Sequence, residues 1–136
     1  MSFENSSALT VVFGGWPSFH DAEVLRLHLD RPGSEGPILE IAIHVFEMTK
    51  DVDSKGYSVL RRHTEVTLRF TRVRSLRVES FNGQNVLSSL DVAQVDPGKS
   101  EGRRLRVRMP SSYGMEAEFE CERAVVADVR AFEPAL

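Results

Sequence analysis

The stretch 103-RRLRVRMPSSYGMEAEFECE-122 decides the fold, because two strictly alternating segments flank a short turn-prone run. Arginines alternate with aliphatic residues in the first segment, and glutamates alternate with apolar residues in the second. Alternation of period two is typical of a strand with one buried face. An antiparallel hairpin that pairs Met109 with Met115 sets arginine opposite glutamate and apolar opposite apolar; the pairs are Arg108–Glu116, Arg106–Glu118, Arg104–Glu120, Val107–Ala117 and Leu105–Phe119. The sequence predicts this register, because a one-residue slip would turn the apolar set to solvent.

Further segments of the chain predict strands in the same way, at residues 24–30, 38–48, 64–70 and 124–132. The segment 38-ILEIAIHVFEM-48 is apolar on both faces, which predicts a central strand. The period slips beyond Phe70, which predicts a bulge or a break near Thr71 and Arg72. The stretch 81-FNGQNVLSSLDV-92 begins with a turn-prone Asn-Gly pair, and its middle fits either a strand or one helical turn. Residues 96–102 read as a loop.

These patterns predict a mainly β fold: an antiparallel sandwich or partly closed barrel of about seven strands, with at most one or two short helical turns. The length of 136 residues suits one domain over residues 1–136, in which residues 1–12 form a loosely ordered N-terminal segment. The single cysteine, Cys121, alternates inward and indicates a buried residue in a reducing compartment. No apolar run predicts a signal peptide or a membrane span, so we expect a cytoplasmic protein.

Charge is segregated along the chain. Residues 1–60 carry 4 Lys and Arg against 9 Asp and Glu, whereas residues 61–110 carry 11 against 5. Of the 17 basic residues 14 are arginine, which pairs well with carboxylates and phosphates. The arginines of residues 61–77 could therefore form a stripe for nucleic acid. The acidic pI of about 5.8 and the lack of interleaved aromatic residues favour a sheet face neutralised within the molecule instead.

The adjacent pair His20-Asp21 raises the question of general-base chemistry. Neighbours in an extended chain point to opposite faces, which argues against a direct hydrogen bond between them. Ser18 and Asp21 have the spacing of a capping box, so the structural alternative is a single turn, capped by Ser18 and held by Trp16 and Phe19, that precedes the strand.

Motifs for other chemistry are missing from the sequence. The histidines have no metal-ligand spacing, and neither a nucleophile elbow nor a Gly-rich phosphate loop occurs. We therefore expect no catalytic residue, no metal ligand and no cofactor.

Three stretches together resemble the immunity protein 50 family. The stretch 16-WPSFHDAEVLRLHLDR-31 resembles its Trp-x-Ser-Phe-His-Asp-x-Glu-Val signature and the strand that follows. The stretch 68-LRFTRVRSLRVESFNGQNVLSSLDV-92 is similar to the family's middle, where a strand ending in Phe leads to Phe-Asn-x-Gln-Asn-Val. The ending 119-FECERAVV-126 fits as well, so the resemblance runs from about Phe13 to Phe132.

The resemblance implies a small cytoplasmic protein of a bacterial polymorphic toxin system, which binds and neutralises a cognate toxin domain stoichiometrically and is not an enzyme. Five residues match the signature and are candidates for partner binding or for holding the fold: Trp16, Phe19, His20, Asp21 and Glu23. Acidic residues of the first 60 could meet a basic toxin nuclease; these are Glu23, Asp30, Glu40, Glu47, Asp51 and Asp53.

Two alternatives stay open beside this expectation. The first is a non-catalytic β-domain of unknown partner, which binds nucleic acid through the arginines of residues 61–77. The second is an enzyme that uses His20 as a general base. Neither implies a membrane partner, and a homo-oligomer is compatible with any of the three.

Overall fold

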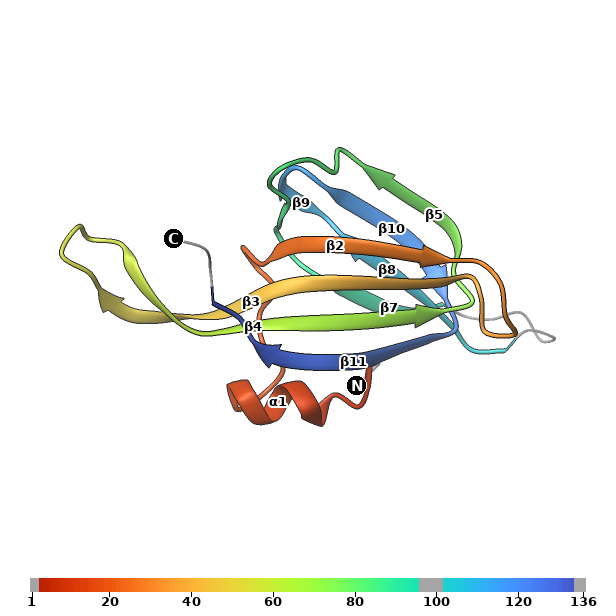
Figure 1. Cartoon of the computed structure of the whole chain (residues 1–136), viewed down its shortest axis with the longest axis horizontal. Coiled ribbons are helices and arrows are strands. Elements are labelled where there is room, and N and C mark those ends of the chain that lie inside the picture. Colours follow the sequence, from red (N-terminus) through yellow and green to blue (C-terminus); the bar gives the residue numbers. More distant parts are fainter. Residues whose placement is uncertain (1–2, 96–101, 134–136) are drawn as a thin grey trace.

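The computed structural model describes residues 3–95 and 102–133 of the chain. It is a β-sandwich of two sheets with one short helix at its side (Figure 1). The described residues form eleven strands rather than about seven, because three of them are only two or three residues long. The elements are β1 (Phe3–Glu4), α1 (Ser7–Phe13), β2 (Glu23–Asp30), β3 (Ile38–Val52), β4 (Ser58–Thr71), β5 (Arg74–Glu79), β6 (Val86–Leu87), β7 (Asp91–Val95), β8 (Arg104–Met109), β9 (Ser111–Tyr113), β10 (Glu116–Cys121) and β11 (Arg123–Ala131).

The large sheet has the order β1-β11-β4-β3-β2-β6-β9, and the small sheet has the order β5-β10-β8-β7. All pairings are antiparallel except that of β1 with β11. The prediction of a central strand over residues 38–48 is confirmed, since β3 lies in the middle of the large sheet. Its outer face is more polar than expected, because Glu40 and His44 lie there beside Ala42.

The core lies between the two sheets and is built from the alternating residues that the sequence predicts as inward. Leu39, Ile41 and Ile43 of β3 are fully buried, as is Phe70 of β4. The ring of Phe70 packs edge-on against Phe119 of the small sheet, with the ring centroids 4.9 Å apart. Aromatic pairs of this geometry contribute about 0.5–1.5 kcal/mol beyond their area burial, so they hold the sheets together.

The chain leaves the large sheet where the sequence predicts a break. β4 ends at Thr71 and β5 starts at Arg74, in the small sheet. Arg72 has a φ of 50°, a left-handed conformation that reverses the inside–outside alternation and turns Val73 into the core. The slip in sequence period is thus the point at which the strand changes sheets.

The hairpin of β8 and β10 is confirmed, but its predicted register is wrong by two residues. Met109 pairs with Ala117 rather than with Met115, so Arg108 lies opposite Glu118 and Arg106 opposite Glu120. The connection is longer than expected because residues 111–113 form β9, which pairs with β6 in the large sheet. A shift of two keeps every side chain on its face, so neither alternation nor charge matching distinguishes the two registers.

The remaining segments follow the prediction with two differences. Residues 3–13 form β1 and α1 where loose order was expected, and they bury Phe3 and Leu9 in the core. Residues 81–92 form β6 and the start of β7, without the alternative helical turn. The last strand is confirmed as β11. The predicted loop at residues 96–102 lies outside the described residues except for its last residue.

The hairpin of β3 and β4 extends well beyond the sandwich (Figure 1). Pairing of β2 with β3 begins at His44, and pairing of β11 with β4 ends at Thr64. Residues 46–62 therefore form a free two-stranded ribbon, which we call the arm. The described part of the chain has no helix long and apolar enough to cross a bilayer.

Candidate functional site

The signature stretch forms the turn that the sequence predicts. Ser18 Oγ accepts a hydrogen bond from the His20 N–H at 3.1 Å, and the Ala22 N–H donates to the Phe19 carbonyl at 3.0 Å. The capping box is not formed, because the N–H of Asp21 donates to Leu87 O instead. Asp21 adopts a φ of 66°, a conformation that aspartate tolerates better than most residues. β2 begins two residues later.

Trp16 and Phe19 hold the turn on the sandwich. Phe19 is buried, and the ring of Trp16 stacks on Phe3 of β1 with the centroids 4.9 Å apart. Trp16 also approaches Phe19 at 5.7 Å. These two signature residues thus join the N-terminal strand, the turn and the core.

His20 and Asp21 lie on the surface, with side chains 63% and 41% exposed. The Nδ1 of His20 is 3.1 Å from the carbonyl oxygen of Ser88, so this nitrogen carries the proton, and Nε2 is 3.6 Å from Oδ1 of Asp21. The expectation that these two side chains point to opposite faces is wrong, because the turn brings both to the same side of the chain. The separation is still too long for a hydrogen bond, and the exposed imidazole has no desolvated surroundings.

Glu23 and the turn dock onto residues 85–87 through backbone hydrogen bonds. Leu87 N donates to Ala22 O, and Val24 N donates to Asn85 O, both at 2.8 Å. The Glu23 carboxylate accepts a further long hydrogen bond from Asn85 N at 3.4 Å. The first and second family-like stretches are therefore pairing partners within the fold.

Asn85 is the residue that sequence reasoning did not single out. Its side chain is buried, and Oδ1 accepts hydrogen bonds from Asn82 N at 2.9 Å and Met115 N at 3.1 Å, while Nδ2 donates to Asn82 O. Gly114 packs so closely that a Cβ there would clash with the carbonyl of Gln84. The Phe-Asn-x-Gln-Asn-Val motif thus closes the β5–β6 loop on the β9–β10 turn.

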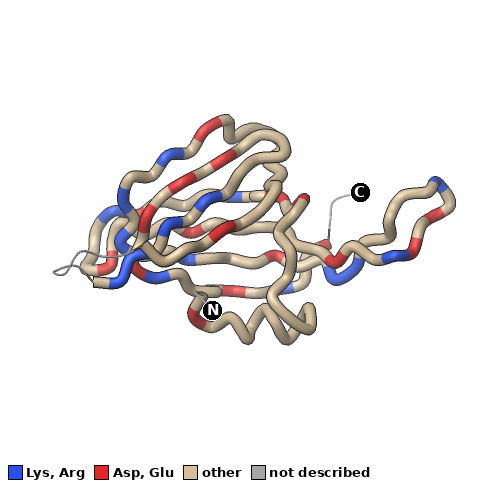
Figure 2. The backbone as a smooth tube through the Cα atoms, turned by 180° about the vertical axis from the view of Figure 1, so that it is seen from behind, with Lys and Arg blue, Asp and Glu red and all other residues tan. Residues whose placement is uncertain are grey.

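Arginines of residues 61–77 do not form a free cationic stripe. Each has a carboxylate partner; the pairs are Arg61–Asp51, Arg62–Glu47, Arg69–Glu40, Arg72–Glu122, Arg74–Glu120 and Arg77–Glu79. Figure 2 shows basic and acidic residues interspersed along neighbouring strands. The arrangement supports the alternative in which a charged face is neutralised within the molecule.

Three of the six acidic candidates of the first 60 residues are engaged by the same pairs, and a fourth is hydrogen-bonded by backbone N–H groups. Glu40, Glu47 and Asp51 have arginine partners, and Asp53 accepts hydrogen bonds from Lys55 N and Tyr57 N. A broad acidic face for a basic partner is therefore not built from these residues.

Glu65 lies nearly buried on the outer face of the large sheet, between Arg26 and Arg130. Burial raises the pKa of this carboxyl, but the hydrogen bond from Arg130 and the charge of Arg26 outweigh burial and hold the pKa below its ordinary value of 4.5. The trio ties β2, β4 and β11 together across the face of the sheet. The trio carries a net charge of +1, and Oδ2 of Asp128 lies 3.8 Å from Nε of Arg130 as a further partner.

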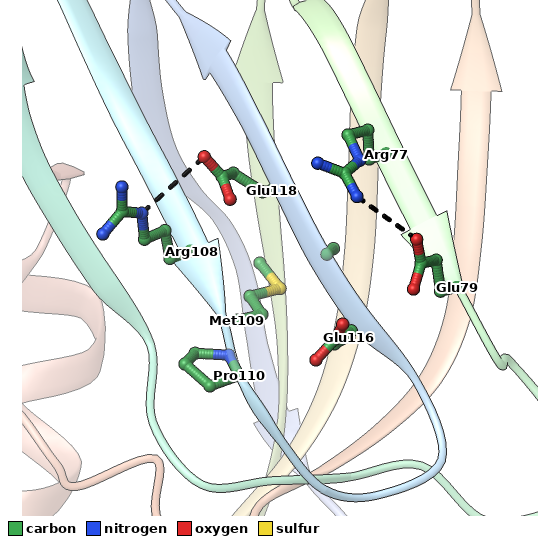
Figure 3. A pocket seen from close by; sticks show the side chains of 8 residues that line it. Arg77, Glu79, Arg108, Met109, Pro110, Glu116 and Glu118 are labelled. Carbon is green, nitrogen blue, oxygen red and sulfur yellow. Dashed lines mark hydrogen bonds and ion pairs between the residues drawn. The ribbon is translucent and has the colours of Figure 1, made fainter.

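A shallow hollow of about 160 Å³ lies on the outer face of the small sheet (Figure 3). Glu116 lies directly opposite Glu79 across β10 and β5, and Arg108 pairs with Glu118 at the other side. A small recess of this kind between charged side chains does not enclose a ligand.

No group of three or more metal-ligating side chains converges among the described residues. Cys121 is buried, as the sequence predicts, and burial raises the pKa of its thiol to about 12. A thiol with so high a pKa is a poor nucleophile.

The arm differs from all these surfaces because four large apolar side chains are exposed on it, among charged and polar ones. Met48, Val52 and Tyr57 are 53%, 65% and 70% exposed, and Leu60 lies opposite Met48. Where the arm leaves the sandwich, Phe46, Glu47 and Met48 line a hollow of about 340 Å³ together with residues 13–18. The first part of the signature stretch and the root of the arm thus share one surface.

No curated protein and no solved structure matches the chain. A family model described as immunity protein 50 matches residues 5–132, nearly the whole of the 136-residue sequence. The match includes the signature turn, the Asn85 loop, both sheets and the arm. The chain therefore belongs to the immunity protein 50 family.

Proposed function

We propose that this protein is the immunity partner of a bacterial toxin domain, and that it neutralises the toxin by binding it stoichiometrically in the cytoplasm of the cell that makes both. The family match over residues 5–132 carries the proposal. The protein works as a binding partner rather than as an enzyme, and it needs no cofactor for this role.

The physical properties of the molecule support such a role. The sandwich is a well-packed scaffold whose charged outer faces are paired internally, so a partner meets a defined surface rather than a labile one. His20 and Asp21 are the signature residues open to a partner, whereas Trp16 and Phe19 secure the fold. Pre-organised surfaces bind tightly because little conformational entropy is lost on association.

Co-expression with the product of the gene adjacent to this one, as the candidate toxin domain, tests the proposal. We expect the protein to restore growth of cells that express the toxin domain, and to co-purify with it as a one-to-one complex by light scattering. A toxin domain from an unrelated system serves as the control and should be neither bound nor neutralised. Failure to rescue growth together with absence of a complex would refute the proposed function.

The nucleic-acid alternative gains no support from the geometry, because the arginines of residues 61–77 are ion-paired. The general-base alternative also gains none, because His20 is exposed at a turn.

A further inference from the structure

We propose that the arm, residues 46–62, is the element that recognises the toxin domain, and that it inserts into an apolar cleft of the toxin whose rim carries carboxylates. This inference rests on the proposed function and deepens it, since it names the contact surface and the chemistry of the site that receives it.

The distribution of exposed apolar side chains is the first observation. Eight large hydrophobic side chains are exposed among the described residues, and four of them lie on the arm. These are Met48, Val52, Tyr57 and Leu60. They add nothing to the core, and an isolated two-stranded ribbon gains little stability from them. Clustered exposed apolar groups on a small protein mark an interaction site.

Charge on the arm selects the chemistry of the partner. Two of its three carboxylates are ion-paired, Asp51 with Arg61 at 2.9 Å and Glu47 with Arg62 at 3.2 Å, and the third, Asp53, accepts backbone hydrogen bonds from Lys55 N and Tyr57 N. Among the described residues, no carboxylate forms an ion pair with Lys50 or Lys55. These are the two lysines of the described chain, and both flank the apolar side chains. A protein surface with carboxylates around an apolar recess is complementary to this pattern.

The arm is ordered for insertion rather than loosely attached. Asp53 Oδ1 accepts hydrogen bonds from Lys55 N at 2.8 Å and Tyr57 N at 3.0 Å, and thereby fixes the turn at the tip. Thr49 Oγ1 donates to Val59 O across the two strands at 2.7 Å. At about 3.3 Å per residue, the strand from Val45 to Val52 gives a reach of roughly 23 Å. Such a ribbon can enter a cleft that the body of the sandwich cannot.

The root of the arm is anchored to the part of the molecule that carries the signature. Arg62 Nη1 donates to the carbonyl oxygen of Val12, at the end of α1, at 3.0 Å. The hollow between residues 13–18 and residues 46–48 continues the arm's surface onto the signature loop. A partner seated on the arm therefore also reaches Trp16 and Pro17.

Affinity for the toxin domain encoded beside the gene, measured by calorimetry, tests this inference with two matched triple variants. The arm variant is Val52→Thr, Tyr57→Ser and Leu60→Thr. The control variant is Val11→Thr, Tyr113→Ser and Leu29→Thr, which removes the same three residue types from exposed positions on the body. We expect the arm variant to bind about 100-fold more weakly, as for loss of an aromatic anchor and its neighbours, and the control to bind within about threefold of the natural protein.

A second variant tests the charge of the receiving site. Lys50→Glu with Lys55→Glu should slow association about tenfold at low salt and reverse its salt dependence, so that added salt speeds association, because carboxylates on the rim would then repel the arm. Unchanged association rates would refute the acidic rim.

The outcomes separate the inference from the proposed function. If the natural protein binds the toxin domain and the arm variant binds equally well, the arm is not the contact element, although the proposed function stands. If the natural protein does not bind the toxin domain at all, both fall together. If the arm instead binds a generic RNA or DNA duplex in the same assay, the arm recognises nucleic acid, and the proposal that it enters a protein cleft is refuted.

Discussion

Strands β3 and β4 run through both the body of the sandwich and the arm, yet their side chains are used in opposite ways in the two regions. Within the body, β3 and β4 alternate buried aliphatic residues with charged residues that pair across strands, as Glu40 does with Arg69. Beyond Val45 and Thr64, no second sheet covers these two strands. Apolar side chains that would be core residues in the body are exposed in the arm.

The comparison teaches that continuous strand patterning does not imply continuous burial. Whether a strand is buried depends on the strands beside it and on the sheet that faces it. At the root of the arm β2 starts and β11 ends, so neither strand flanks the arm. We therefore expect substitutions in the body to change the free energy of unfolding and substitutions in the arm to change binding. The following substitutions test this division between body and arm.

The largest effect is expected for Phe70→Ala in β4. Phe70 is fully buried and packs against both Phe3 and Phe119, so truncation leaves a cavity between the sheets. We predict a loss of about 3–5 kcal/mol in the free energy of unfolding, measured by urea titration. Tyr57→Ala on the arm, as the matched aromatic control, should change this free energy by less than about 0.5 kcal/mol. Similar losses for the two variants would contradict the division.

Asn85→Ala is expected to cost somewhat less. The substitution leaves the N–H groups of Asn82 and Met115 without their shared acceptor at a buried site. We predict a destabilisation of about 2–3 kcal/mol in the same urea titration. Gln84→Ala, which removes an exposed side chain of the same loop, is the control and should change this free energy by less than about 0.5 kcal/mol. A stability within error of the natural protein would show that the loop relaxes around the loss.

Glu65→Gln tests the ion-paired outer face of the body. The carboxyl has a pKa held below 4.5, so its contribution is fully present above that pH and is lost as the pH falls through the lower folded-state value. At pH 7 we expect the variant to be less stable by about 1–2 kcal/mol. The difference should shrink when the titration is repeated towards pH 3, and a difference that stays constant with pH would contradict the electrostatic account.

His44 sits at the junction of body and arm, where its Nε2 lies 2.9 Å from Nδ1 of His63 and its ring packs 4.4 Å from that of Phe132. Burial lowers the pKa of His44, and the charge of His63 lowers it further below 6.5. The neighbouring strands add Glu65 and Glu23 at the paired positions. A group with a lowered folded-state pKa stabilises fully above its unfolded pKa and progressively less below it.

Acid should therefore loosen the junction before it affects the core. We predict that the amide of Phe132, which donates to His63 O, exchanges with solvent a few-fold faster relative to its intrinsic rate as the pH falls from 6.5 to 5. His44→Phe should abolish this acceleration, whereas His28→Gln on the exposed face should not. Equal acceleration in the natural protein and His44→Phe would assign the effect to another group.

The sequence was sufficient to predict a mainly β fold, a sandwich or a partly closed barrel, because the long strands of the body alternate with a period of two, and the slip at Thr71 and Arg72 marks the change of sheet. It could not fix the register of β8 and β10, since registers two residues apart bury the same side chains. It placed the signature turn correctly but not the approach of His20 to Asp21, which depends on the left-handed conformation of Asp21. The arm was missed because the sequence pattern ends one strand at Met48 and starts the next at Thr64, whereas the two strands extend to Val52 and from Ser58.

Hydrogen exchange measured by mass spectrometry, on the protein alone and in complex with the toxin domain that we propose as its partner, tests the division between body and arm. If the arm is the recognition element, peptides covering residues 46–62 should gain strong protection in the complex, while those of β8 and β10 should be unchanged. Protection confined to the small sheet, with the arm exchanging as fast as in the free protein, would contradict the account.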